Sequence, residues 1–297
     1  MKFINTPISR FDNLDGYPFK PNYIETDDGM QMHYVDEGPK DGEVILCLHG
    51  EPSWSYLYRK MIPVFAKAGY RVIAPDLIGF GKSSKPTEIA DYSFQKHVDW
   101  VKHFIKQIDL QDINLFCQDW GGLIGLRILA EDSKRFSRAV AANTGLPTGE
   151  HVPSEAFLQW QKFSQKVDFF PIGSMIQRAT VSELSDAEVA AYDAPFPDES
   201  YKAGARIFPA LVPTSIDDVE SDNNKRAWAK LMTFNKPFLT LFSDGDPITK
   251  GGEKVIQKLI PGAKGQNHTI IKGGGHFLQD DKGGEIAALM IDFIEAT

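Results

Sequence analysis

The sequence predicts an α/β protein that is built on a mostly parallel, doubly wound sheet with an inserted helical segment. Apolar runs of strand length alternate with helical patterns in both halves of the chain, which is typical of strand–helix–strand units. Between residues 147 and 230 this alternation stops, and helix signals appear there without a buried strand. We therefore expect a main domain formed by residues 1–146 and 231–297, and a helical cap formed by residues 147–230.

The elements of the first half can be placed by their patterns. A hairpin is expected over 24–38, because Asp28-Gly29 is a turn signal that precedes strand-like residues. The continuous apolar run at 44–49 is typical of a strand that is covered on both faces. The remaining elements expected here are a helix from about Ser55 to Gly69, a short strand at 71–74 and a helix at 94–108.

The second half continues this alternation around the cap. A strand at 113–118 leads into a helix near 123–130, and another strand is expected at 138–142. Within the cap, Ser185 and Glu188 form a capping box before an alanine-rich helix. After the cap we expect strands at 238–242 and 268–271 and a C-terminal helix, which carries apolar residues at helical spacing: Ile286, Leu289, Met290 and Phe293.

Composition excludes several classes of function. The net charge is -8 and no basic stripe is present, so nucleic acid is not an expected partner. No stretch approaches the ~20 apolar residues of a membrane helix, and the N-terminus lacks an apolar signal core. Cys47 and Cys117 lie in apolar runs, which favours buried, reduced thiols. We expect a cytoplasmic monomer that uses neither a metal nor another cofactor.

The glycine-rich stretch at 76–83 invites a nucleotide-binding interpretation, because it contains Gly81-Lys82-Ser83. A phosphate-binding loop also needs a glycine five positions before the glycine of that glycine–lysine pair. Asp76 stands at that position, so we interpret the stretch as an ordinary loop.

The central feature of the chain is Asp119, which follows the strand-like run 113–118 and precedes Trp120-Gly121-Gly122 and a helix. A strand that enters a tight turn and a helix is the setting of a nucleophile elbow, which raises one reactive side chain above the sheet. Asp246 and His276 also stand in loops just past predicted strands, and such loops converge at the carboxyl edge of an open sheet. The order nucleophile, acid, histidine is that of the α/β-hydrolase fold.

On three motifs the chain resembles the haloalkane dehalogenases of the α/β-hydrolase superfamily. They are His49-Gly50-Glu51-Pro52-Ser53-Trp54, Gln118-Asp119-Trp120-Gly121-Gly122 and Gly275-His276-Phe277, and the cap segment 192–197 also fits. The resemblance covers nearly the whole chain. It implies an α/β-hydrolase fold and selects Asp246, rather than the nearby Asp244, as the acid.

The resemblance also implies a two-step reaction, for which an aspartate nucleophile is chemically suited. A carboxylate is ionised at neutral pH, so Asp119 can displace halide without a base and leave an alkyl ester that can be hydrolysed. His276 would then activate water for attack on this ester, while Asp246 orients the imidazole. The backbone N–H groups of Glu51 and Trp120 would hold the oxyanion. The products would be an alcohol, a halide ion and a proton.

Halide binding requires hydrogen-bond donors, and an indole N–H is a donor without a competing acceptor. Trp120, next to the nucleophile, is the first candidate. Trp160 and Trp228 are the only tryptophans in the expected cap. The segment Phe157-Leu158-Gln159-Trp160 resembles the cap motif of the subgroup that takes its second halide donor from the cap, which favours Trp160. Phe157 is expected to line the substrate pocket.

Two other functions remain open from the sequence. An epoxide hydrolase shares the aspartate nucleophile but opens its substrate with two cap tyrosines, for which Tyr192 and Tyr201 are available. A non-catalytic, ligand-binding relative is the other alternative, although the complete set Asp119, Asp246 and His276 disfavours it. The natural substrate and its chain length do not follow from the sequence.

Overall fold

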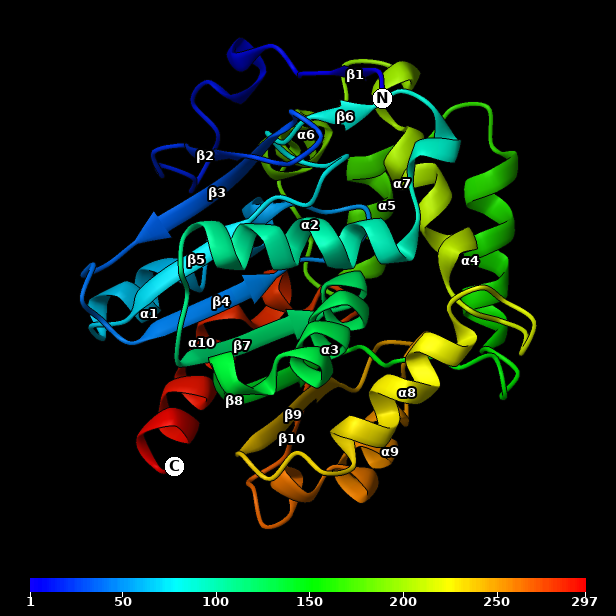
Figure 1. The fold of residues 1–297 in the computed structure, drawn as a ribbon. Helices are drawn as coiled ribbons and strands as arrows, with labels where there is room; N and C mark the ends of the chain where they lie inside the picture. The colour runs from blue at the N-terminus through cyan, green and yellow to red at the C-terminus, as the bar shows by residue number, and fades with distance from the viewer.

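The computed structural model describes residues 1–297, and its centre is an eight-stranded sheet (Figure 1). The strand order is β10-β9-β8-β7-β4-β5-β3-β2. The six strands from β10 to β5 run parallel, whereas β3 is antiparallel to both β5 and β2. The strands are β2 Asn22–Glu25, β3 Gln31–Glu37, β4 Val44–Leu48, β5 Arg71–Pro75, β7 Ile113–Gln118, β8 Phe136–Ala142, β9 Phe238–Ser243 and β10 Thr269–Ile271. The predicted α/β fold with a mostly parallel sheet is confirmed.

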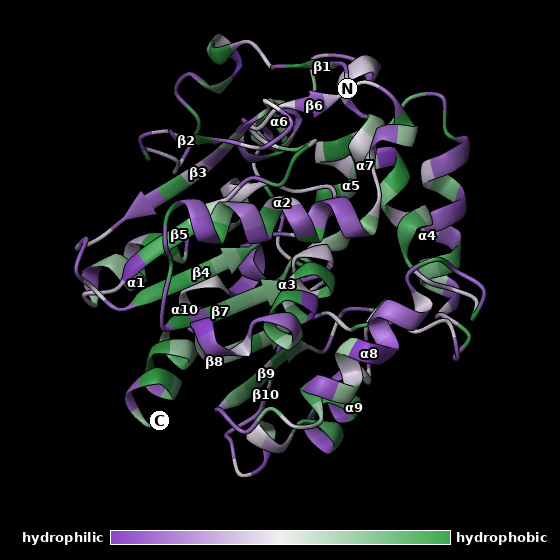
Figure 2. Cartoon of the chain, viewed as in Figure 1, coloured by the Kyte–Doolittle hydropathy of each residue, from purple (hydrophilic) through white to green (hydrophobic).

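Two hydrophobic cores cover the two faces of this sheet. Neighbouring residues of a strand point to opposite faces, and accordingly Leu46 belongs to one core and Ile45 to the other. Helices α2 Phe94–Gln107, α3 Trp120–Glu131 and α9 Gly252–Leu259 cover the first face, and α1 Ile62–Lys67 and α10 Leu278–Glu295 cover the second. In Figure 2 the central strands β4 and β7 are accordingly mostly hydrophobic, as strands buried on both faces are, whereas β3 is hydrophilic toward its end.

The N-terminal hairpin and the two cysteines agree with the sequence. Strands β2 and β3 pair across a turn in which Gly29 has a φ of +76°. Cys47 and Cys117 are free and buried. A second, two-stranded sheet that the sequence did not indicate joins β1 Phe3–Ile4 to β6 Lys85–Pro86.

The predicted helix from Ser55 to Gly69 is wrong in its continuity. The structure has a short 3₁₀ helix at Ser55–Tyr58 and then α1 at Ile62–Lys67. Pro63 is the physical reason, because proline lacks the N–H that an internal helical turn requires. At the start of α1 this N–H is not needed, and the new helix begins there.

Five helices connect β8 to β9, and we call residues 147–230, which contain nearly all of them, the cap. They are α4 Glu155–Lys166, α5 Ile172–Ala179, α6 Asp186–Asp193, α7 Ala203–Ile207 and α8 Ser221–Leu231. The predicted capping box is present at the start of α6, where Ser185 and Glu188 each accept the other's backbone N–H. Figure 1 shows α4, α5 and α7 beyond the carboxyl ends of β4 and β7, so the cap faces the loops that carry the predicted site. None of the helices is long and apolar enough to span a membrane.

Candidate active site

Asp119 stands in a strained turn between β7 and α3. Its φ of +50° and ψ of -127° are rare for a residue with a side chain. The turn is possible because its neighbours are small: a Cβ on Gly121 would lie 2.0 Å from the carbonyl oxygen of Leu48. Likewise, a Cβ on Gly50 would lie 2.3 Å from the Asp119 side chain. The predicted elbow is therefore present, and it places the carboxylate directly against the loop that follows β4.

The Asp119 carboxylate has one backbone donor and one histidine beside it. Its Oδ1 accepts a hydrogen bond from the Glu51 N–H at 2.8 Å, and its Oδ2 lies 3.4 Å from Nε2 of His276. The carbonyl oxygen of Asp119 accepts from the Thr144 hydroxyl at 2.7 Å. Of the two amides expected in the oxyanion site, only that of Glu51 bonds to this carboxylate in the structure.

Asp246 and His276 form the rest of the relay. Nδ1 of His276 lies 3.1 Å from Oδ2 of Asp246, and both side chains are buried. The N–H of Ile248 and the hydroxyl of Thr249 donate to the same carboxylate. Asp244, the alternative acid, instead accepts from the Gly273 N–H at 2.9 Å and is partly exposed. The structure therefore brings Asp246, and not Asp244, to the histidine.

The neighbouring charges strongly shift the pKa values of His276 and Asp246. Burial opposes protonation of His276, but the carboxylates of Asp246 and Asp119 outweigh it and raise the pKa of the imidazole to about 10. For Asp246, burial favours the neutral acid, yet His276 and the donors from Thr249 and Ile248 lower its pKa to about 2. The histidine is thus a cation held between two carboxylates when no substrate is bound.

The two candidate cap tryptophans differ in what their indole N–H groups contact. Nε1 of Trp160 donates to Oε2 of Glu51 at 3.2 Å, inside the site. Nε1 of Trp228 donates to the carbonyl oxygen of Leu146 at 2.7 Å and is thereby occupied by the main chain. Trp120 is buried and packs edge-on against Phe94, with ring centroids 5.0 Å apart.

The side chain of Glu51 is a feature that the sequence did not indicate. It is buried, and its Oε1 has no hydrogen-bond partner, while its Oε2 accepts only the Trp160 indole. Burial and the nearby Asp119 carboxylate raise the pKa of Glu51 well above its usual range. A carboxyl group whose neutral form is favoured by its surroundings therefore lies between Asp119 and Trp160.

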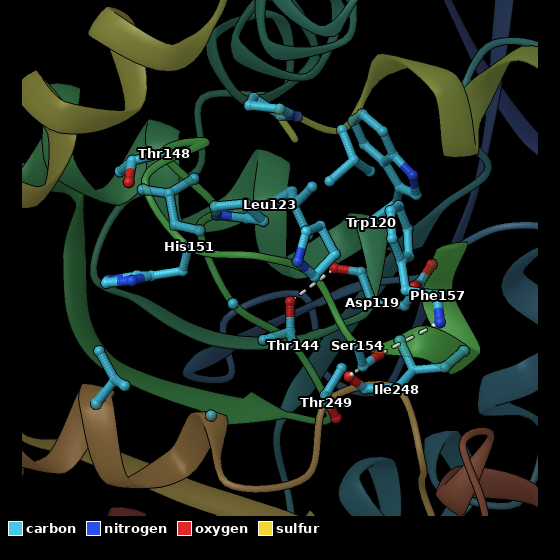
Figure 3. A pocket seen from close by; sticks show the side chains of 18 of the residues that line it. Asp119, Trp120, Leu123, Thr144, Thr148, His151, Ser154, Phe157, Ile248 and Thr249 are labelled. Atoms are coloured by element: carbon cyan, nitrogen blue, oxygen red, sulfur yellow. Dashed lines mark hydrogen bonds between the residues drawn. The ribbon is translucent and has the colours of Figure 1, made fainter. Parts of the chain in front are cut away.

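These groups open into one cavity of about 890 Å³. Its inner residues include Asp119, Trp120, Phe157, Trp160 and His276, and apolar residues of α8 and α9 extend it outward. In Figure 3, Asp119, Trp120 and Phe157 lie toward one end of the cavity, and Thr148 and His151 lie toward the other. The cavity is largely apolar, as a site for a small organic ligand usually is.

No tyrosine lines the cavity. The Tyr192 hydroxyl donates to the carboxylate of Asp280 in a buried cluster outside the site, and Tyr201 is equally absent from the cavity wall. The tyrosines that an epoxide hydrolase would use are therefore not brought to Asp119. This geometry argues against that alternative.

Two residues that support the histidine were not found from the sequence. Nε2 of Gln118 donates to the His276 carbonyl oxygen at 3.1 Å. The Asn143 side chain donates to the carbonyl oxygens of Gly275 and His276 at 2.9 and 3.1 Å, and the backbone carbonyl oxygen of Asn143 accepts from the Asp119 N–H. Asn143 directly follows the strand β8, and this position at the carboxyl edge was the available signal.

Comparison with known proteins agrees with this arrangement. A family model described as the alpha/beta hydrolase fold matches residues 43–283. A haloalkane dehalogenase from Psychrobacter cryohalolentis is 56% identical over 99% of this chain and 98% of its own length, and one from Mycobacterium marinum is 48% identical over 99% and 100%. The structure of a haloalkane dehalogenase from Paraglaciecola agarilytica NO2, described as tetrameric, superimposes with a TM-score of 0.91 at 38% identity and covers 97% of both chains. This chain therefore belongs to the haloalkane dehalogenases, hydrolases of the α/β-hydrolase fold that act on carbon–halide bonds.

Proposed function

We propose that this enzyme cleaves haloalkanes through an alkyl ester on Asp119. The contact that carries the proposal is the line Asp119–His276–Asp246, with distances of 3.4 and 3.1 Å. In the first step an Asp119 oxygen attacks the carbon that bears the halogen. The new carbon–oxygen bond forms as the carbon–halogen bond breaks, and the halide leaves with the electron pair.

In the second step water attacks the carboxyl carbon of the ester. His276 takes the proton from water, and Asp246 stabilises the imidazolium that forms. The oxyanion is held by the N–H of Glu51, which already lies against Asp119 at 2.8 Å, and by the N–H of Trp120. Collapse of this intermediate releases the alcohol, which takes the proton from His276. The second proton of the water then leaves the Asp119 carboxyl group, so that the carboxylate is restored and one proton is released overall.

The leaving halide is proposed to lie between the indole N–H groups of Trp120 and Trp160. Trp160 is favoured over Trp228 because its N–H points into the site toward Glu51, whereas that of Trp228 is bonded to the main chain. A halide that enters would take the Trp160 donor from Glu51, a neutral acid that loses little by giving it up. This assignment would place the enzyme in the subgroup whose second halide donor comes from the cap.

The substrate is proposed to lie with its alkyl chain against Phe157 and the apolar wall of the cavity. The carbon–halogen bond would then sit at the inner end, beside Asp119 and Trp120. We further propose that residues 147–230 form a cap domain over this cavity and that the enzyme is a monomer. Light scattering after size-exclusion chromatography tests the monomer, and a mass of four chains would instead match the assembly described for the Paraglaciecola protein.

Trapping the ester tests the mechanism. In His276→Phe, alkylation should proceed because Asp119 needs no base, but hydrolysis should stop. Intact-mass spectrometry after incubation with a bromoalkane should show one alkyl group, and peptide mapping should place it on Asp119. His103→Phe, a change near the surface outside the cavity, is the matched control and should turn over without an adduct. No adduct with bromoalkanes but one with an epoxide would contradict the proposal.

A further inference from the structure

The loop that carries His276 is held from outside by the cap. The backbone N–H of His276 donates to the carbonyl oxygen of Ala179, the last residue of α5, at 2.7 Å. The approach is close, because a Cβ on Gly275 would lie 2.4 Å from the same oxygen. The main chain of the histidine is thus in direct contact with the cap.

One side chain, Asp281, binds both sides of this contact. Its Oδ2 accepts a hydrogen bond from the Gly275 N–H at 2.7 Å, within the histidine loop. Its Oδ1 accepts from the N–H groups of Val181 and Ser182 at 3.0 and 2.6 Å, in the cap turn that follows α5. Asp281 lies in the first turn of α10, where a negative charge is favourable. A single carboxylate therefore joins three backbone donors from the two segments.

The cap is also anchored to the main domain by contacts that do not involve Asp281. The neighbouring Asp280 lies 2.6 Å from the Arg59 guanidinium, and the same guanidinium lies 2.5 Å from Glu188 of helix α6. Tyr192 of α6 also donates to Asp280. This buried ion cluster joins the cap to the main domain, and none of its side chains bonds to Gly275 or His276. Asp281 is therefore not needed merely to hold the cap in place.

We propose that Asp281 is a positioning residue, which fixes the His276 loop against the cap turn so that the imidazole faces the Asp119 ester. This inference rests on the roles proposed above for Asp119 and His276. Alkylation uses the Asp119 carboxylate and the halide donors but not the imidazole as a base, so it should not depend on the exact placement of the loop. Hydrolysis uses the imidazole, whose placement depends on the backbone of residues 275 and 276. Asp281 therefore acts on the second half-reaction and not on the first.

Asp281→Asn tests this division, with Asp244→Asn as the matched control. Asp244 also accepts from a glycine N–H of the same loop, that of Gly273, but no bond joins it to the cap. Rapid-quench experiments with excess enzyme over a bromoalkane give the rate of halide release and the decay of the alkyl-enzyme separately. In Asp281→Asn we expect alkylation within about twofold of the wild type and hydrolysis about tenfold slower, short of the ~100-fold that a misplacement of about 1 Å can cost. The alkyl-enzyme should then accumulate and be visible by intact mass.

Other outcomes would overturn the inference. Unchanged hydrolysis in Asp281→Asn, or an equal fall in both half-reactions, would show that Asp281 does not act through His276. The same slow hydrolysis in Asp244→Asn would mean that any weakening of the loop suffices. If Asp281→Asn does not fold, Asp281→Glu retains the charge with a longer side chain and should give a smaller slowing of hydrolysis alone. Failure of His276→Phe to trap an ester would instead contradict the proposed function, independently of these variants.

Discussion

The assignment of the halide site makes a quantitative prediction for Trp160→Phe. This change removes the indole N–H but keeps an aromatic ring, which can retain the stacking of Trp160 on Phe163 and Phe170, whose centroids lie 5.9 and 5.6 Å away. The effect should therefore report the donor and not the packing of α4. We expect weaker halide binding and a slower carbon–halogen cleavage step.

The magnitude follows from an exchange of hydrogen bonds. A hydrogen bond to an ion contributes ~1.5–3 kcal/mol, and a neutral one contributes about 1 kcal/mol. With Glu51 in the neutral form that its raised pKa favours, the Trp160 N–H already donates to a neutral acceptor at 3.2 Å, and a halide gains only the difference. That difference is about 0.5–2 kcal/mol, or roughly a two- to thirtyfold loss of halide affinity in the variant. Both bromide and chloride should bind more weakly to the variant, whereas the affinity of uncharged ligands of the cavity should not fall.

Trp228→Phe is the matched control for this measurement. Its N–H donates to the Leu146 carbonyl at 2.7 Å, so its removal should lower stability by about 1 kcal/mol while leaving halide affinity within about twofold. Equilibrium bromide titration followed by tryptophan fluorescence gives the affinity, and chemical denaturation gives the stability. Equal losses of halide affinity in the two variants, or a larger loss in Trp228→Phe, would refute the assignment of Trp160.

Three further changes have expected outcomes. Tyr192→Phe should leave kcat for a bromoalkane within about threefold, because this hydroxyl bonds only within the buried cluster around Asp280. It should lower Tm, because a lost buried hydrogen bond costs ~1–3 kcal/mol. A collapse of kcat at unchanged Tm would favour the epoxide hydrolase alternative. Folding raises the pKa of His276 from 6.5 to about 10, so its protonated form should stabilise the fold fully below pH 6.5 and progressively less as pH rises to about 10. Measured against pH, Tm should therefore fall over this range, and His276→Phe should remove this fall. Gly121→Ala should cost more than ~3 kcal/mol or prevent folding, since its Cβ would lie 2.0 Å from a backbone oxygen that cannot move away; urea unfolding close to that of the wild type would contradict this reading of the elbow.

The positions of the main strands along the chain and of the elbow could be predicted because local patterns indicate them. The run 113–118 is apolar except at Asn114 and Gln118, and it is buried throughout as β7, since helices cover both faces of the sheet there. The small residues after Asp119 are required by contacts within a few residues of the turn and with the adjacent strand. Parallel order then brings Asp246 and His276 to the same edge, so sequence order alone predicts that they meet Asp119.

Features that depend on contacts between distant segments did not follow in the same way. Helix α9 at 252–259 was not predicted, although its apolar residues Val255, Ile256 and Leu259 face the cavity and β9. Glu51 was predicted only as a backbone N–H donor. Its side chain was given no role, because nothing in the local sequence shows that a cap tryptophan, 109 positions later, donates to it. Asp281 lies 99 or more positions from its partners in the cap turn. Such pairs depend on how the cap packs against the sheet, and no pattern in a single sequence predicts that packing.

The electrostatics of the relay suggest how one histidine serves a reaction whose first step does not need it. Before substrate binds, the charges of Asp119 and Asp246 both hold the imidazole in its protonated form, in which it cannot accept a proton from water. A cation beside Asp119 also balances the negative charge of its partly buried carboxylate. Alkylation converts Asp119 into a neutral ester and so removes one of the two charges that raised the pKa of His276. The imidazole then loses its proton more readily, and the base becomes available only once the ester that it must hydrolyse has formed. In the proposed mechanism Asp119 would thus be both the nucleophile and a group whose charge influences when His276 can act.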